Sequence, residues 1–141
     1  MKTINGDLLD MTSVVICHQV NCQKVAGAGL ALSIRKKHPK WYAHFLTVDG
    51  RLGHVDLFSD GTLWIASLYA QYRYGRVGKF TDDIAFEVCL AGLRKQIQAQ
   101  RIRTEVCFPY GIGCGLAGGD WSVIEPKIAW YFPDAIIVKK F

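Results

Sequence analysis

Two glycine-rich segments are the parts of this sequence best suited to handle a phosphorylated ligand. The first, NCQKVAGAG, covers residues 21–29, and the second, GIGCGLAGG, covers residues 111–119. Each follows an apolar run and precedes a helical pattern. Glycine lets the backbone approach a ligand closely, and the N–H groups at the start of a helix favour phosphate. Either segment alone is better explained as a tight strand–helix connection, but the two together predict a diphosphate site.

The spacing of these glycines excludes two familiar nucleotide-binding motifs. Neither segment contains GxGxxG or GxxxxGK[ST], so the sequence indicates neither a Rossmann dinucleotide motif nor a Walker P-loop. In open α/β sheets, ligands bind beyond the carboxyl ends of the strands. We therefore expect the two segments to lie together at that edge of a sheet.

His18 lies near the end of the run TSVVICHQV, three residues before Asn21, where this run leads into the first glycine-rich segment. An imidazole titrates near neutral pH, so His18 could act as a general acid, a general base or a nucleophile at a phosphate monoester. A buried histidine that only supports the segment explains the same position equally well.

The elements that must position these residues alternate along the chain. Strands are predicted for the runs KTIN, TSVVICHQV, HVDLFS, TLWIASLYA, TEVCFPY and DAIIVKKF. Helices are predicted for AGLALSIRKKHP, WYAHFLTV, TDDIAFEVCLAGLRKQIQAQ and DWSVIEPKIAWYF. Several strands are apolar without interruption, which is typical of sheets covered on both faces. The alternation predicts an α/β layered domain.

The helix ends give sharper expectations. We expect Thr81 to cap the third helix and Asp120 to cap the fourth, in which Pro126 should strain or shorten the helix. The apolar stripe expected on the third helix consists of Ile84, Phe86, Val88, Leu90, Leu93 and Ile97.

Length and composition favour one globular domain over residues 1–141, with no internal repeat or linker. No apolar run approaches the length of a membrane span, and the N-terminal residues do not read as a signal peptide. We expect a cytoplasmic monomer. The net charge of +5 is concentrated in residues 33–40 and at the C-terminus. A solvated helix face explains it better than a nucleic-acid footprint.

The cysteines and histidines predict neither disulfides nor a metal site. The five cysteines are odd in number and form no CxxC pair, which favours buried free thiols in a reducing compartment. The four histidines do not cluster at ligand spacings. No metal and no cofactor are expected.

Four stretches resemble the macrodomain family, whose members bind ADP-ribose. They are NGDLLD, VICHQVNCQKVAGAGLA, IASLYAQYRYGR and FPYGIGCGLAGGDW, which occur in family order across essentially the whole chain. The nearest resemblance is to the branch that contains ADP-ribose 1''-phosphate phosphatases, terminal ADP-ribose glycohydrolases and antitoxins that reverse DNA ADP-ribosylation. It implies a three-layer α/β/α fold with a mixed central sheet of about six strands.

The resemblance also implies roles for individual residues. Asp7 would accept a hydrogen bond from the adenine amino group, Leu8 would supply neighbouring backbone, and Asn21 would hold the distal ribose. The first phosphate loop would comprise Val25, Ala26, Gly27 and Gly29. The second would comprise Gly111, Ile112, Gly113, Cys114, Gly115 and Leu116, with the Cys114 side chain packed beneath it.

Two departures from the family pattern concern the chemistry. Where glycohydrolases of this branch carry a lysine, this chain has Gln71, and where one subgroup carries an acid after GCGL, this chain has Ala117. The pattern is instead similar to the phosphatase-type members, with His18 and Asn21 as the candidate catalytic residues. Among the tyrosines that could wall the ligand (Tyr69, Tyr72 and Tyr74), Tyr72 is the candidate to test together with Gln71.

We therefore expect a hydrolase that acts on ADP-ribose 1''-phosphate or on an ADP-ribosyl bond to protein or nucleic acid. A reader that holds ADP-ribose without turnover is the alternative, and an RNA-binding domain is a weaker one.

Overall fold

The computed structural model describes residues 1–140, and within them the strands form a single six-stranded sheet. The strands are β1 (Lys2–Asn5), β2 (Val15–Asn21), β3 (Val55–Ser59), β4 (Trp64–Gln71), β5 (Val106–Pro109) and β6 (Ile136–Lys139). The helices are α1 (Gly29–Lys37), α2 (Pro39–Phe45), α3 (Asp83–Ala99) and α4 (Trp121–Tyr131), and a 3₁₀ turn spans Leu8–Asp10.

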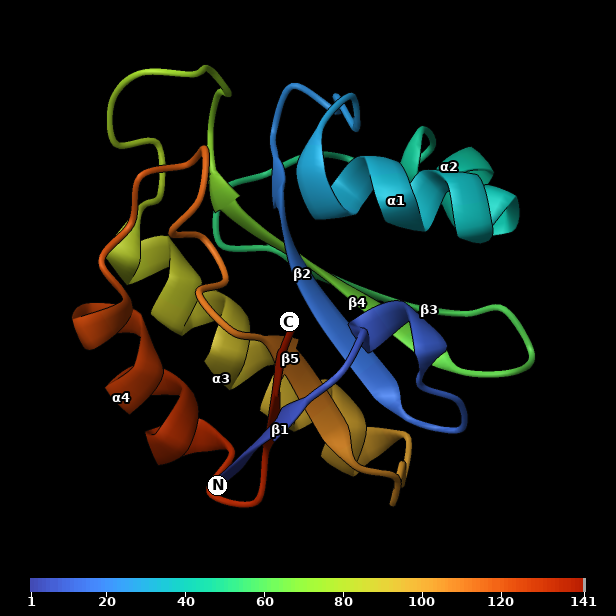
Figure 1. The fold of residues 1–141 in the computed structure, drawn as a ribbon. Helices are drawn as coiled ribbons and strands as arrows, with labels where there is room; N and C mark the ends of the chain where they lie inside the picture. Colours follow the sequence, from blue (N-terminus) through green and yellow to red (C-terminus); the bar gives the residue numbers. More distant parts are fainter. Residues whose placement is uncertain (141) are drawn as a thin grey trace.

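The sheet is mixed and lies between two helical layers, as predicted. Its strand order is β1-β6-β5-β2-β4-β3, in which only the β3–β4 pair is antiparallel. Helices α1 and α2 cover one face of the sheet, and α3 and α4 cover the other (Figure 1). The prediction of a three-layer α/β/α domain is confirmed.

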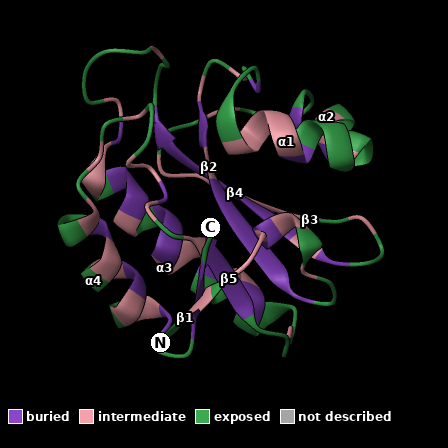
Figure 2. Ribbon diagram, in the orientation of Figure 1, coloured by how far each residue is buried: buried purple, intermediate pink, exposed green. Residues whose placement is uncertain are grey.

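Strand β2 runs through the middle of the sheet and is buried on both faces (Figure 2). Cys17 packs with the α3 and α4 side of the core, and Ile16 packs with Trp41 and Phe45 from α2 on the other side. This double burial explains why the run reads as continuously apolar. It also holds the residues at the end of β2 in a rigid frame.

The expected cap and stripe of α3 were partly wrong. Asp82 caps the helix, because its carboxylate accepts a hydrogen bond from the N–H of Ala85 at 2.9 Å. The Thr81 hydroxyl instead donates to the carbonyl oxygen of Gly113 at 2.6 Å. In the stripe, Ile84 and Val88 are 78% and 53% exposed. The buried face is formed by Ala85, Phe86, Cys89, Leu90, Leu93 and Ile97.

Pro126 does not break α4, which continues through it from Trp121 to Tyr131. The proline removes the hydrogen bond to the carbonyl of Ser122. Both residues are exposed, so water can satisfy that carbonyl and the buried face of the helix is unaffected. Asp120 caps α4 as predicted, by accepting from the N–H of Ser122 at 2.9 Å.

The parallel strands bring distant residues to one edge of the sheet. Asn21 ends β2, Gln71 ends β4 and Pro109 ends β5, so the segments that follow them meet at the carboxyl edge. None of the helices in residues 1–140 combines the length and apolarity needed to cross a membrane.

Candidate ligand-binding site

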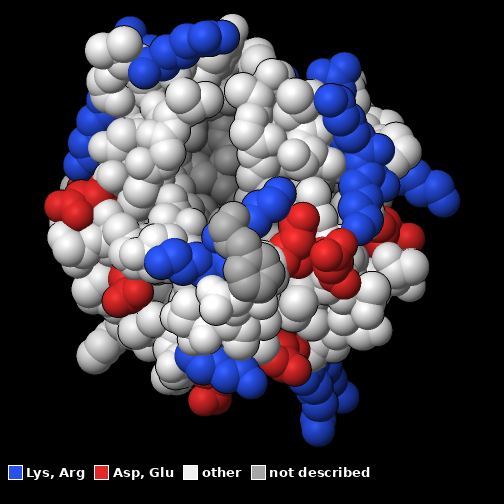
Figure 3. Space-filling view, viewed as in Figure 1, with Lys and Arg blue, Asp and Glu red and all other residues white. Residues whose placement is uncertain are grey.

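A cavity of about 800 Å³ opens at this edge, between the two glycine-rich segments. Figure 3 shows it as a hollow in the surface, with basic side chains near its rim. Its size suits a small-molecule ligand. The predicted site residues that line it are His18, Asn21, Val25, Gly27, Gly29, Gln71, Gly111, Ile112, Gly113, Gly115 and Leu116.

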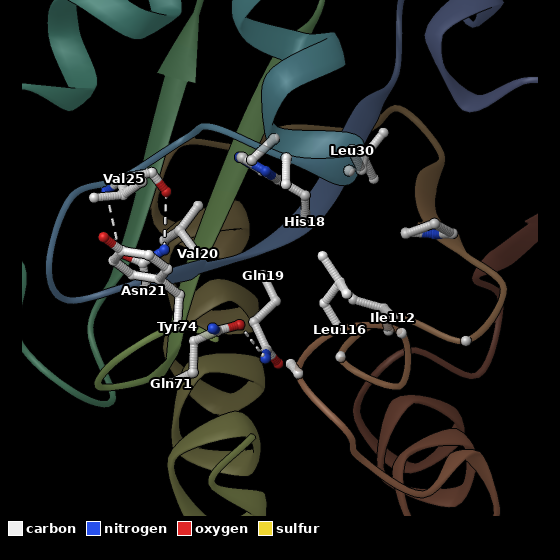
Figure 4. Close-up of a pocket in the computed structure, with 18 of the residues that line it drawn as sticks. His18, Gln19, Val20, Asn21, Val25, Leu30, Gln71, Tyr74, Ile112 and Leu116 are labelled. Atoms are coloured by element: carbon white, nitrogen blue, oxygen red, sulfur yellow. Dashed lines mark hydrogen bonds between the residues drawn. The ribbon is translucent and has the colours of Figure 1, made fainter. Parts of the chain in front are cut away.

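Five predicted residues lie outside the lining of this cavity. Ala26 and Leu8 are buried in the core. Asp7 caps the 3₁₀ turn by accepting from the N–H of Leu9 at 2.9 Å. Cys114 packs against the core, and burial raises the pKa of its thiol. The side chain of Tyr72 is largely exposed to solvent, whereas the neighbouring Tyr74 lines the cavity (Figure 4).

The first glycine-rich segment is closed by Asn21. Its side-chain oxygen accepts from the N–H of Val25 at 3.1 Å, and its nitrogen donates to the carbonyl of Val25 at 2.8 Å (Figure 4). One N–H of this amide is still free for a ligand. Helix α1 then starts at Gly29, whose φ is 58°, and Ala28 supplies no side-chain cap. The first N–H groups of α1 are therefore open to an anion.

The second glycine-rich segment is ordered by its own hydrogen bonds. Cys114 N–H donates to the carbonyl of Gly111 at 2.8 Å, and Gly119 N–H donates to that of Gly113 at 2.8 Å. Gly111 and Gly113 both have a φ of 74°, a conformation that favours glycine. Within residues 1–140, the N–H groups of Gly113, Gly115 and Leu116 have no hydrogen-bond acceptor. Such a run of free N–H groups suits an anion.

His18 lies under α1 and is almost fully buried (Figure 4). Its Nε2 is 2.9 Å from the hydroxyl of Ser67, which also accepts from the indole N–H of Trp41 at 3.0 Å. Burial lowers the pKa of His18 to about 3, so the ring is neutral at physiological pH. If the Ser67 hydroxyl donates to Nε2, the proton of the neutral ring is on Nδ1, which has no partner within the described chain.

The side chain of Gln19 points the other way from β2, towards the second glycine-rich segment (Figure 4). Its amide nitrogen donates to the side-chain oxygen of Gln71 at 2.8 Å and to the hydroxyl of Thr81 at 2.9 Å. Gln19 lines the cavity, and Thr81 lies directly behind Gly113. Neither Gln19 nor Thr81 was predicted as a site residue. The HQVN run placed Gln19 beside two candidate residues, but nothing in the sequence pointed to Thr81 as its partner.

The cavity contains few groups that can exchange protons. Among the described residues that line it, Arg76 is the only one with a charged side chain, and no aspartate, glutamate or lysine is present. Ala117 stands where an acid would follow GCGL, and its carbonyl accepts from the N–H groups of Phe80 and Thr81. All five cysteines are free. Nowhere in residues 1–140 do three histidine, cysteine, aspartate or glutamate side chains gather in a way that could hold a metal.

No protein-family model and no curated protein matches the sequence. Solved structures do. The macrodomain of Mycobacterium tuberculosis DarG is 24% identical over 99% of this chain and 97% of that chain, with a TM-score of 0.81. Thermosipho africanus DarTG in complex with ADP-ribose is 18% identical over 96% of this chain and 40% of that chain, with a TM-score of 0.79. A Trypanosoma brucei macrodomain in complex with ADP is 12% identical over 97% of this chain and 61% of that chain, with a TM-score of 0.71.

These similarities extend over nearly the whole chain and agree with the layer order and mixed sheet described above. The chain therefore has the macrodomain fold.

Proposed function

We propose that this protein binds ADP-ribose and hydrolyses an ADP-ribose derivative at the distal ribose. The observation that carries the proposal is the pair of glycine-rich segments on either side of one cavity, each with backbone N–H groups open to an anion. Two of the similar solved structures hold ADP-ribose or ADP. A diphosphate between the segments would receive hydrogen bonds from both sides.

The other contacts of the ligand are proposed from the resemblance of the sequence and from the residues that line the cavity. The free N–H of Asn21 would donate to a hydroxyl of the distal ribose, and Asp7 would accept from the adenine amino group. Tyr74 and Arg76, at the rim, would lie near the group attached to the distal ribose. That group would be a phosphate in ADP-ribose 1''-phosphate, or the protein or nucleic acid in an ADP-ribosyl conjugate.

Hydrolysis would add water at the distal ribose and release phosphate or the macromolecule without its modification, leaving ADP-ribose. His18 and Asn21 are the residues proposed to serve this step. Because His18 is neutral at pH 7, it has no spare proton to give as a general acid. With a pKa of about 3 it is also a weak base, so its contribution would come from a hydrogen bond.

A non-catalytic reader of ADP-ribose is the second candidate. The shortage of ionisable groups in the cavity favours it, since His18 is neutral and no carboxylate lines the described part of the site.

The deciding experiment incubates purified protein with ADP-ribose 1''-phosphate, ADP-ribosylated protein and ADP-ribosylated DNA. Released phosphate and ADP-ribose are measured, and calorimetry measures ADP-ribose affinity. Binding with turnover supports the hydrolase, and binding without turnover supports the reader. If ADP-ribose does not bind, both candidates fail.

The His18→Ala variant then tests the residue. A role in the reaction lowers kcat by on the order of a hundredfold while ADP-ribose affinity changes little. Equal losses of rate and affinity would make His18 a support for the site.

A further inference from the structure

The side chain of Gln19 connects two segments at the cavity, the second glycine-rich segment and residues 73–76, which follow β4. Through Thr81 it reaches the carbonyl of Gly113 in the second glycine-rich segment. Through Gln71 it reaches the carbonyl of Arg73, at the start of residues 73–76 after β4, because the Gln71 amide nitrogen donates to that carbonyl at 3.1 Å. We propose that Gln19 is a positioning residue that holds both of these segments in the conformation that accepts the distal part of the ligand.

The hydrogen-bond directions in this network are fixed by its ends. The carbonyl of Gly113 can only accept, so the Thr81 hydroxyl must donate to it. The Thr81 oxygen then accepts from Gln19, which requires the amide nitrogen of Gln19, and not its oxygen, to face Thr81. The second N–H of Gln19 goes to the side-chain oxygen of Gln71. No other side-chain arrangement satisfies both backbone carbonyls with these partners.

Fixing the carbonyl of Gly113 restricts the segment that contains the free N–H groups. This carbonyl accepts both from Thr81 and from the N–H of Gly119, so it is held from two directions. At a φ of 74°, Gly113 would otherwise have wide rotational freedom. The network thereby orients the backbone around Gly115, which lines the cavity.

The side chain of Gln19 also lowers the stability of the folded state in a way that a side chain needed only for packing would not. The oxygen of Gln19 is buried and has no hydrogen-bond partner within the described residues. A buried acceptor without a donor destabilises the folded state. A leucine would fill similar space without that cost, which is why the stability and the positioning effects of a substitution can be separated.

The inference rests on the proposed function for its ligand and is tested by two measurements. The first is amide hydrogen exchange of residues 111–119 in the unliganded protein. The second is the ratio of the ADP-ribose and AMP affinities, because AMP lacks the second phosphate and the distal ribose. The variants are Gln19→Leu and Thr81→Val, with Thr81→Ser as the variant that keeps the hydroxyl. The matched control is Gln96→Leu, which removes a glutamine hydrogen bond to the carbonyl of Val55 outside the cavity.

For Gln19→Leu and Thr81→Val, we expect exchange of residues 111–119 to rise at least tenfold and the affinity ratio to fall at least tenfold. Thr81→Ser should keep both the exchange and the affinity ratio at their native values, and Gln96→Leu should change neither. Unchanged exchange and an unchanged ratio in Gln19→Leu would overturn the inference, as would equal effects in Gln96→Leu. If the native protein does not prefer ADP-ribose to AMP, the proposed function fails, while the exchange measurement still decides whether Gln19 positions the loop.

Discussion

Replacing Gly27 or Gly115 by alanine separates what the fold needs from what the ligand needs. Both glycines line the cavity, one in each glycine-rich segment, and neither has a positive φ. A Cβ at Gly115 would meet nothing within 4 Å, and at Gly27 only the Val25 side chain at 3.6 Å. The folded chain therefore has room for alanine at both positions. The proposed ligand, which would approach the backbone at both positions, accounts for a glycine there.

The two effects of the substitution are expected to have opposite signs. Alanine in a compatible conformation reduces the freedom of the unfolded chain, which stabilises the protein by about 0.4–1 kcal/mol and raises Tm by roughly 1–4 °C. The methyl group would stand where a phosphate oxygen meets the N–H groups. Losing one hydrogen bond to a charged group costs about 1.5–3 kcal/mol, so ADP-ribose affinity should fall roughly tenfold to hundredfold.

Thermal unfolding and calorimetry with ADP-ribose measure both effects in each variant. Gly6→Ala is the matched control, since a Cβ there also meets nothing within 4 Å and Gly6 lies outside the cavity lining. It should show normal affinity. If Gly27→Ala and Gly115→Ala are stable and bind ADP-ribose with native affinity, the segments are only connections and the two-loop model is refuted. Loss of binding in one variant alone would leave a single phosphate-binding segment.

Three further predictions concern other residues of the site. Because the pKa of buried His18 is about 3 in the folded state, the unfolded chain binds a proton at His18 first as the pH falls, so the contribution of His18 to stability should fall by roughly 1.5 kcal/mol between pH 6.5 and pH 5. Urea unfolding should show that His18→Gln lacks this fall, and an identical pH dependence in the variant would contradict the prediction. Asp7→Ala should weaken ADP-ribose binding roughly tenfold or more. Asp7→Asn should keep the 3₁₀ turn, because its amide oxygen still accepts from the N–H of Leu9. Normal binding by a folded Asp7→Ala would limit the role of Asp7 to capping the turn. Gly113→Val should abolish ADP-ribose binding, measured by calorimetry. It should also lower the free energy of unfolding, measured in urea, by at least the cost of about 1–2 kcal/mol for a left-handed residue, since its Cβ would lie 2.7 Å from the Gln19 oxygen. Native affinity in a folded Gly113→Val would contradict this prediction.

Local patterns in the sequence were sufficient for the elements and their layers. The six strand runs and four helical runs all appear in the structure. They were predictable because continuous apolar runs and helical spacing record burial on the scale of a few residues. Errors fell where two local signals competed. Thr81 and Asp82 are both good caps, and the choice of Asp82 leaves Thr81 free to bond Gly113.

The sequence by itself determined where the two glycine-rich segments follow their strands, and parallel pairing then had to bring them to one edge. Only the tertiary structure decided what faces the cavity between them. Tyr74, and not Tyr72, lines it, because the conformation of the segment after β4 sets which side chain turns inward. His18 is neutral because Trp41 and Ser67 enclose it, and the bonds of Gln19 join residues 52 and 62 positions away. Contacts between residues so far apart depend on how the layers pack, which no local pattern records.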